Sequence, residues 1–122
     1  VDDAVRYAQQ RQQFGQPIGK FQAISHMLAD LQVQTDAARL LLYRAAWLVD
    51  QGVPCVKEAS MANLYATENL VRVTSDAMRV YGGYGFTMEF DIQRHFRDSR
   101  LFVIGDGSSQ IQRNLIARMM GL

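Results

Sequence analysis

Two long stretches of helical periodicity, separated by a short break, limit the folds open to this chain more than any other feature. Apolar residues recur at spacings of three and four over residues 21–51 and again over residues 54–81. Gly52 suits the position after a helix C-terminus, and Pro54 cannot continue a helix. Because the connection is so short, the sequence predicts an antiparallel helical hairpin at the centre of the fold.

Each of these two helices carries an apolar face that we expect to be buried. In the first helix the face comprises Ile24, Met27, Leu28, Leu31, Ala38, Leu42, Ala45 and Val49. In the second helix it comprises Ala59, Ala62, Ala66, Leu70, Val73, Ala77 and Val80. The small residues of the second face predict close packing against a neighbouring helix.

Shorter segments complete a chain that we predict to fold as one all-α domain over residues 1–122, an antiparallel up-and-down helical bundle. Residues 1–10 read as the last turns of a helix that begins upstream, because so short a helix is marginal alone. Ser109, with Gln112 three positions on, has capping-box spacing. The other segments are expected as loops over 11–20 and 84–90, a short helix over 91–99, an irregular connection over 101–107 and a last helix over 109–120.

Composition argues against several classes of function. The net charge of +1 gives no attraction to nucleic acid or to an anionic membrane. No apolar run approaches the roughly 20 residues that a membrane-spanning helix needs. The single cysteine, Cys55, cannot form an internal disulfide and agrees with a reducing compartment. One cysteine with two histidines argues against a metal site.

An acid flanked by glycines, just before the last helix, is the first candidate site. Asp106 lies between Gly105 and Gly107, directly before Ser108 and Ser109. Glycines let the backbone approach a ligand closely, and free N–H groups at a helix N-terminus suit an anion or a polar cofactor group. In this interpretation Asp106 is a working carboxylate at the lip of a site. The alternative is an ordinary turn before a helix, with an acid that faces solvent.

Two further candidates lie at glycine-containing loops. Arg11, close to Gly15, is able to meet a phosphate with both guanidinium arms; the alternative is a surface arginine favoured by a helix C-terminus. The segment 79–86 combines three glycines with aromatic residues. It suits a flat or phosphorylated ligand, or it is a helix end with packed rings. Because it follows a helix rather than a strand, a Rossmann dinucleotide site is excluded.

The charged residues between 94 and 100 are the last candidate. Arg97 and Asp98 come shortly before the glycine-flanked acid, where a positioning role is one interpretation. The other is a solvated face with local ion pairs, which contribute little to stability. His26 and His95 have no partner that the sequence shows, and we interpret them as structural or surface residues.

Taken together and in this order, the motifs resemble the C-terminal helical domain of the acyl-CoA dehydrogenases over the whole chain. The resemblance rests on Tyr7-Ala8-x-x-Arg11-x-x-Phe14-Gly15-x-Pro17-Ile18, Phe21-Gln22, Gly82-Gly83-Tyr84-Gly85, Arg97-Asp98 and Gly107-Ser108-Ser109-Gln110-Ile111-Gln112. It implies a longer flavoenzyme in which a helical domain and a β domain precede this one, so that the present residues alone are inactive. It also implies a homodimer or homotetramer with FAD bound between domains and across a dimer contact.

The resemblance implies roles for individual residues as well. Asp106 matches the catalytic base, and Gly107 matches the glycine beside the substrate thioester. Gly105 belongs to the substrate pocket, at a position where many members have an aromatic residue. Arg11 matches an arginine that reaches the FAD diphosphate of the neighbouring subunit. The other residues that match cofactor contacts are Phe14, Gln22, Arg79, Val80, Tyr81, Gly82, Gly83, Ser108, Ser109 and Gln110.

The implied reaction is the α,β-dehydrogenation of an acyl-CoA thioester to a trans-2-enoyl-CoA. A carboxylate removes the proton alpha to the carbonyl while hydride leaves the beta carbon for the flavin, and electrons then pass to an electron-transfer flavoprotein. The implied location is the cytoplasm or the mitochondrial matrix, with the cytoplasm favoured. The alternatives are a family member with altered chemistry, a subunit that has lost catalysis, and a helical module used only in assembly.

Three positions depart from the family pattern. Asp106 stands where glutamate is usual, and its shorter arm matters because a misplacement on the order of 1 Å can slow a reaction about a hundredfold. Gly105 replaces an aromatic residue, which would let the backbone advance Asp106 and would leave room for a branched or cyclic acyl group. Arg79 replaces the usual glutamine and adds positive charge near the cofactor phosphates.

Overall fold

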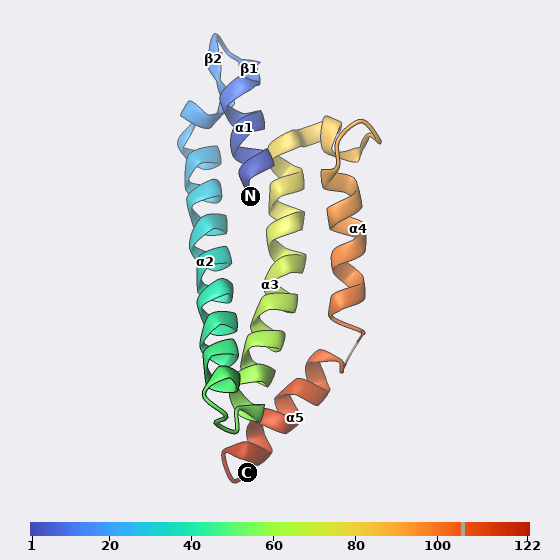
Figure 1. Cartoon of the computed structure of the whole chain (residues 1–122). Coiled ribbons are helices and arrows are strands. Elements are labelled where there is room, and N and C mark those ends of the chain that lie inside the picture. The colour runs from blue at the N-terminus through green and yellow to red at the C-terminus, as the bar shows by residue number, and fades with distance from the viewer. Residues whose placement is uncertain (106) are drawn as a thin grey trace.

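Two long antiparallel helices form the centre of the molecule, as the sequence predicts. The computed structural model describes residues 1–105 and 107–122. In it α2 (Gln22–Asp50) and α3 (Val56–Tyr81) lie side by side over most of their length (Figure 1). On its other side α3 packs against α4 (Ile92–Phe102), and α5 (Ser109–Met119) packs across its lower part (Figure 1). The all-α bundle is therefore confirmed.

The segment that was expected to be a loop over 11–20 is structured, so that expectation is wrong. After α1 (Asp2–Gln10), strands β1 (Gln12–Gln13) and β2 (Gln16–Pro17) pair as a small antiparallel hairpin, which a 3₁₀ turn (Ile18–Lys20) follows. The hairpin projects from the upper end of the bundle (Figure 1). Strands of two residues are too short to show an alternating pattern, so the sequence carries no strand signal here.

The hairpin turn is built by two residues with positive φ. Phe14 has φ 51° and Gly15 has φ 79°, as the two central residues of a type I′ turn require. Gly15 adopts this conformation at no steric cost, whereas Phe14 has a Cβ that disfavours it. The side chain of Phe14 is nevertheless 91% exposed at the tip. Strain of this kind, in an exposed aromatic residue, marks Phe14 as a candidate for function.

Most helix ends lie close to their predicted positions. Gly52, with φ 66°, ends α2, and Gly82, with φ 58°, ends α3. The second long helix begins at Val56 rather than at Pro54. Where a loop was expected over 84–90, a 3₁₀ helix, η2 (Gly82–Phe86), occupies the first part.

Two predictions near the last helices are wrong. α4 extends through Phe102, so the irregular connection is shorter than 101–107. The capping box is absent, because Ser108 rather than Ser109 is the N-cap of α5 and makes no side-chain cap hydrogen bond. The Gln112 Nε2 atom donates instead to the Gly107 carbonyl at 3.3 Å.

The core lies where α1, α2, α3 and the start of α4 meet. Its buried members are Ala4, Ala8, Leu31, Val73, Ala77, Val80, Tyr81 and Ile92. The predicted faces are buried only in part: Leu42 and Val49 on α2 are 56% and 63% exposed, and Ala59 and Leu70 on α3 are exposed as well. On α2 the reason is that α1 and the hairpin cover only its N-terminal end (Figure 1).

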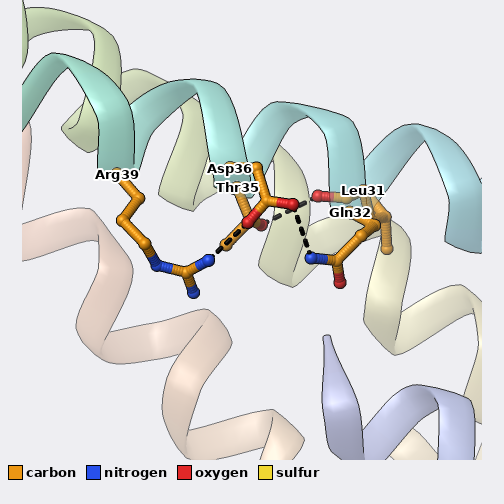
Figure 2. A network of polar contacts seen from close by, with 5 residues as sticks. All are labelled: Leu31, Gln32, Thr35, Asp36 and Arg39. Atoms are coloured by element: carbon orange, nitrogen blue, oxygen red, sulfur yellow. Dashed lines mark hydrogen bonds and ion pairs between the residues drawn. The ribbon is translucent and has the colours of Figure 1, made fainter.

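Polar contacts within α2 join residues of successive helical turns (Figure 2). Asp36 accepts a hydrogen bond from Gln32 Nε2 at 3.0 Å and pairs with Arg39, while Thr35 Oγ1 donates to the Leu31 carbonyl at 2.8 Å. Partners three and four positions apart support the helix itself and not its packing. Within the described ranges, no helix combines the length and the apolar character that crossing a bilayer requires.

Candidate functional site

An open cavity of about 530 Å³ brings together residues that the sequence predicts at two distant motifs. Arg11 lines it from the end of α1, and Arg79, Val80, Tyr81, Gly82 and Gly83 line it from the end of α3. The packing of α1 on α3 creates this meeting, since the Tyr7 and Tyr81 rings stack with centroids 4.2 Å apart. The two motifs therefore form one site at the upper end of the bundle.

The Arg11 backbone is held on both sides. Its N–H donates to the Tyr7 carbonyl at 2.8 Å, which ends α1, and its carbonyl accepts from the Ile18 N–H at 2.8 Å across the hairpin. The guanidinium lies over the ring of Tyr84, with Cζ 5.1 Å from the ring centroid. Arg11 is thus restrained at both its backbone and its side chain where it lines the cavity.

Arg79 provides a second guanidinium on the cavity wall. Its Nη1 atom forms an ion pair with Asp76 Oδ1 at 2.9 Å, one helical turn earlier, and the side chain is 71% exposed. Arg79 has donors left for a ligand, because a guanidinium carries five N–H groups and the ion pair with Asp76 engages only part of them. The cavity thus has two arginines, from α1 and α3.

Backbone groups make up the rest of this wall. Val80 and Tyr81 are buried, and burial raises the pKa of the Tyr81 phenol. Their side chains serve the core, so they would contact a ligand chiefly through the main chain. Gly82, with φ 58° and ψ −137°, turns the chain in a region of backbone space that side chains disfavour. A Cβ at Gly83 would meet no atom within 4 Å, so the space beside it is open.

Phe14 and Gln22 lie at the same end of the molecule and are not among the residues that line the cavity. The Phe14 ring contacts Phe21 edge-on, with centroids 6.1 Å apart, and Gln22 follows Phe21 as the first residue of α2. Both Phe14 and Gln22 are exposed. These two predicted cofactor residues therefore face outward from the hairpin side.

The third group of predicted residues lies elsewhere. Ser108, Ser109 and Gln110 line a second open cavity, of about 460 Å³, together with Glu68 and Val71 of α3 and Val103 and Ile104. At about 1.5 Å of rise per residue, roughly 20 Å of α3 separate Glu68 from Tyr81. The structure therefore does not bring all predicted cofactor residues into one cavity of one chain.

The glycines of this group have restricted surroundings. The Gly105 N–H donates to the Leu101 carbonyl at 2.7 Å, and a Cβ at Gly105 would lie 3.3 Å from the same oxygen. Gly107 has φ 92°, and a Cβ there would lie 2.9 Å from Gln112 Nε2. Both positions therefore suit glycine. Asp106, the predicted catalytic base, lies outside the described residues.

An ion pair beside this cavity joins α3 to α5, and the sequence gives no sign of it. Glu68 on α3 and Arg113 on α5 meet with Nη1–Oε1 at 2.8 Å and Nη2–Oε2 at 2.9 Å. Hydrogen bonds from Arg113, and a further one from Ser109, lower the pKa of the Glu68 carboxyl despite an opposing effect of burial. The sequence could not predict this pair, because no local motif links Glu68 to Arg113. Tyr84, which contacts Arg11, does belong to the glycine-rich segment that could be recognised from the sequence.

The remaining predicted candidates lie away from these two cavities, although Asp98 and His95 line another cavity of about 300 Å³ beside the core. Arg97 Nε donates to Asp98 Oδ1 at 3.3 Å, and both side chains are exposed, as expected of a solvated face. Among the residues that the structure describes, neither of the two cavities above is lined by Arg97, Asp98, His26 or His95.

The donor set of the upper cavity fits one class of ligand. Two guanidiniums are suited to a diphosphate, which they bind with paired N–H donors. Open backbone at Gly82 and Gly83 suits a flat aromatic group nearby. A dinucleotide-like cofactor that carries a diphosphate therefore matches these residues.

Comparison with known proteins identifies the family of the chain. The family model "Acyl-CoA dehydrogenase, C-terminal domain" matches residues 1–121. Subunit CarC of the caffeyl-CoA reductase-Etf complex of Acetobacterium woodii is 43% identical over 98% of this chain and 32% of its own length. The chain spans about a third of the length of the relatives it matches.

Solved structures share the fold closely. Butyryl-CoA dehydrogenase of Megasphaera elsdenii superposes with a TM-score of 0.97 at 39% identity, over 99% of this chain and 32% of that one. The FAD complex of PigA superposes with a TM-score of 0.95 at 36% identity, with the same coverage. With a family match over nearly its whole length, the chain belongs to the acyl-CoA dehydrogenase family, in the part that forms the C-terminal domain.

Proposed function

We propose that this chain is the C-terminal helical domain of a longer, FAD-dependent enzyme that dehydrogenates acyl-CoA thioesters. The observation that carries the proposal is the cavity where Arg11 meets the segment from Arg79 to Gly83. Its two guanidiniums and open glycine backbone match the diphosphate and adenylate parts of FAD. A relative named as a butyryl-CoA dehydrogenase and another solved with FAD support the same assignment.

The complete site is built from two copies of the chain in this proposal. The upper cavity and the residues Ser108, Ser109 and Gln110 lie roughly 20 Å apart along α3. One extended cofactor would contact the upper cavity of one subunit and the α5 N-terminus of its partner. The exposed Phe14 ring and the Gln22 amide would then contact the cofactor that is shared with the partner. At least a homodimer follows, and a homotetramer of paired dimers is compatible with it.

Bound FAD would supply the hydride acceptor, and the chain would supply position and a base. Asp106 is proposed to take the proton alpha to the thioester carbonyl, beside Gly107. Free N–H groups at the start of α5, with Ser108 and Ser109, would hold polar atoms of the cofactor. Such a base must be held in a defined orientation and shielded from water, because the alpha proton is very weakly acidic.

A cyclic or aromatic acyl group is the substrate class that we favour. Gly105 lacks the aromatic side chain that many members carry, and the vacated volume would lie next to the acyl chain. The short contact of a Gly105 Cβ with the Leu101 carbonyl, 3.3 Å, is a reason why a larger residue would fit poorly. The related CarC is named as a subunit of a caffeyl-CoA reductase-Etf complex, so we also propose an electron-transfer flavoprotein as redox partner.

Anaerobic mixing of the complete flavoprotein with a panel of acyl-CoAs tests the proposal. We expect rapid bleaching of the flavin by at least one of them, and loss of that bleaching in Asp106→Asn. The asparagine variant keeps the shape of the side chain and removes its basicity. Bleaching of Asp106→Asn at the wild-type rate would show that another group is the base. A complete protein that purifies without flavin and does not take it up would point to a helical assembly module instead.

A further inference from the structure

We infer that Tyr84 is the positioning residue for Arg11, so that an aromatic ring one turn beyond α3 determines how the guanidinium meets the cofactor diphosphate. The inference rests on the proposed role of Arg11 in binding FAD. It adds a residue that does not belong to the predicted cofactor set. Tyr84 acts through Arg11 and need not touch the reacting atoms.

The contact between the two residues has the geometry of a cation–π interaction. The Arg11 Cζ atom lies 5.1 Å from the centroid of the Tyr84 ring. Such contacts are effective within about 6 Å. Among the described residues, no carboxylate lies within ion-pair distance of Arg11, in contrast to Arg79, which is held by Asp76. The ring of Tyr84 is therefore the side-chain support that the structure provides for this guanidinium.

The Tyr84 ring is 47% exposed and contacts the margin of the core through Phe90. Phe90 contacts Tyr84 with centroids 6.0 Å apart, and Phe90 in turn packs edge-on against buried Tyr81 at 5.3 Å. The Tyr84 carbonyl accepts hydrogen bonds from the Thr87 N–H at 3.1 Å and from Thr87 Oγ1 at 2.9 Å. Phe90 and Thr87 thus restrain the ring and the backbone of Tyr84 within the chain itself.

A fixed ring matters because a free arginine has many rotamers to lose on binding. The Arg11 backbone is already held by Tyr7 and Ile18, and the Tyr84 ring restricts the far end of the side chain. A cation–π contact engages none of the N–H donors of a guanidinium in a conventional hydrogen bond, so these donors can still bind phosphate oxygens. Preorganisation of this kind raises affinity by lowering the entropy lost on binding.

Titration of the FAD-stripped complete protein with FAD tests the inference. Tyr84→Leu retains an apolar contact with Phe90 and removes the π face, so we expect FAD affinity to fall about three- to fivefold. Tyr84→Phe retains the ring and should bind FAD within twofold of wild type. Phe86→Leu is the matched control, because Phe86 lies in the same 3₁₀ helix, is 87% exposed and supports no cation among the described residues.

A double-mutant cycle separates positioning from a general structural effect. In an Arg11→Met background, Tyr84→Leu should cause no further loss of FAD affinity. An equal loss of FAD affinity in both backgrounds would overturn the positioning role of Tyr84 and leave the role of Arg11 intact. The same conclusion would follow if Arg11→Met weakened binding while Tyr84→Leu alone did not. Unchanged affinity in Arg11→Met would overturn the proposed role of Arg11 and the positioning role with it. Urea unfolding of each variant verifies that folding is retained.

Discussion

The Glu68 carboxylate and the Arg113 guanidinium form a bidentate ion pair that joins α3 to the first turns of α5. The two contacts measure 2.8 Å and 2.9 Å, which is the paired geometry in which arginine and carboxylate bind best. Ser109, one of the predicted cofactor residues, helps to lower the pKa of the same carboxyl. The pair therefore helps to set where α5 begins relative to α3.

This pair predicts a pH dependence of stability. Its hydrogen bonds lower the pKa of Glu68 in the folded state, so the contribution is complete above the ordinary glutamate pKa of about 4.3. It is lost as pH falls through the lowered pKa. We expect Glu68→Gln to shift the urea midpoint downward at pH 7 and to have a smaller effect at pH 3, with a modest size because both side chains are about half exposed.

Glu89→Gln is the matched control for this experiment. It makes the same chemical change at an exposed glutamate that has no ion pair among the described residues. Its urea midpoint should follow wild type at both pH values. A Glu68→Gln effect of equal size at pH 7 and pH 3 would mean that packing, and not the charge, links the two helices.

The positive φ of Phe14 predicts an order of stability between two substitutions. Phe14→Asn and Phe14→Ala both remove the ring, but asparagine tolerates the left-handed conformation and alanine does not. The asparagine variant should have the higher free energy of unfolding, by about 1 kcal/mol. Both variants should bind FAD more weakly if the exposed ring contacts cofactor. Chemical denaturation and FAD titration measure the two effects, and an alanine variant as stable as the asparagine variant would contradict the turn geometry.

The two adjacent glycines after α3 should respond differently to alanine. Gly82→Ala places a Cβ on a backbone with φ 58° and ψ −137°, and such strain costs on the order of 1–3 kcal/mol. Gly83→Ala meets open space, so its free energy of unfolding should stay within about 0.5 kcal/mol of wild type. Thermal unfolding of the pair checks this. Equal destabilisation would show that the special backbone is not confined to Gly82.

Arg79→Gln restores the residue that is usual in the family. It removes one positive charge from the wall of the upper cavity, so we expect FAD affinity to fall about three- to tenfold at low salt. The loss should shrink as salt rises, because screening weakens exposed charges. FAD titration at two salt concentrations tests this. Asp76→Asn, which frees Arg79 from its ion pair, serves as the comparison and should not weaken binding.

Much of the helical architecture could be predicted because its signals are local. The periodicity of α2 and α3 and the break at Gly52 and Pro54 are features of neighbouring residues. The prediction missed the hairpin at 12–17, because its strands are too short to show a pattern. It also assigned Leu42 to the core, because an exposed apolar residue at helical spacing cannot be told from a buried one. A helical period identifies a face and does not say whether another element covers it.

The candidate site divides in the same way. The motifs around Arg11, around Gly82 and around Ser108 could each be recognised from the sequence, and so could the family. Asp106 remains a prediction from the sequence, since it lies outside the described residues. Which motifs share a cavity could not be deduced, because that depends on how α1 and the end of α3 pack.

The sequence by itself therefore determined the helices, their antiparallel pairing and the residue types available for chemistry, because these follow from short-range periodicity and from glycine and proline. Only the tertiary structure decided that Arg11 stacks on Tyr84, that Glu68 pairs with Arg113, and that the predicted cofactor residues lie in separate regions of the chain. The physical reason is that these contacts join residues far apart in the chain. Their energies depend on where whole helices pack, which no local pattern encodes.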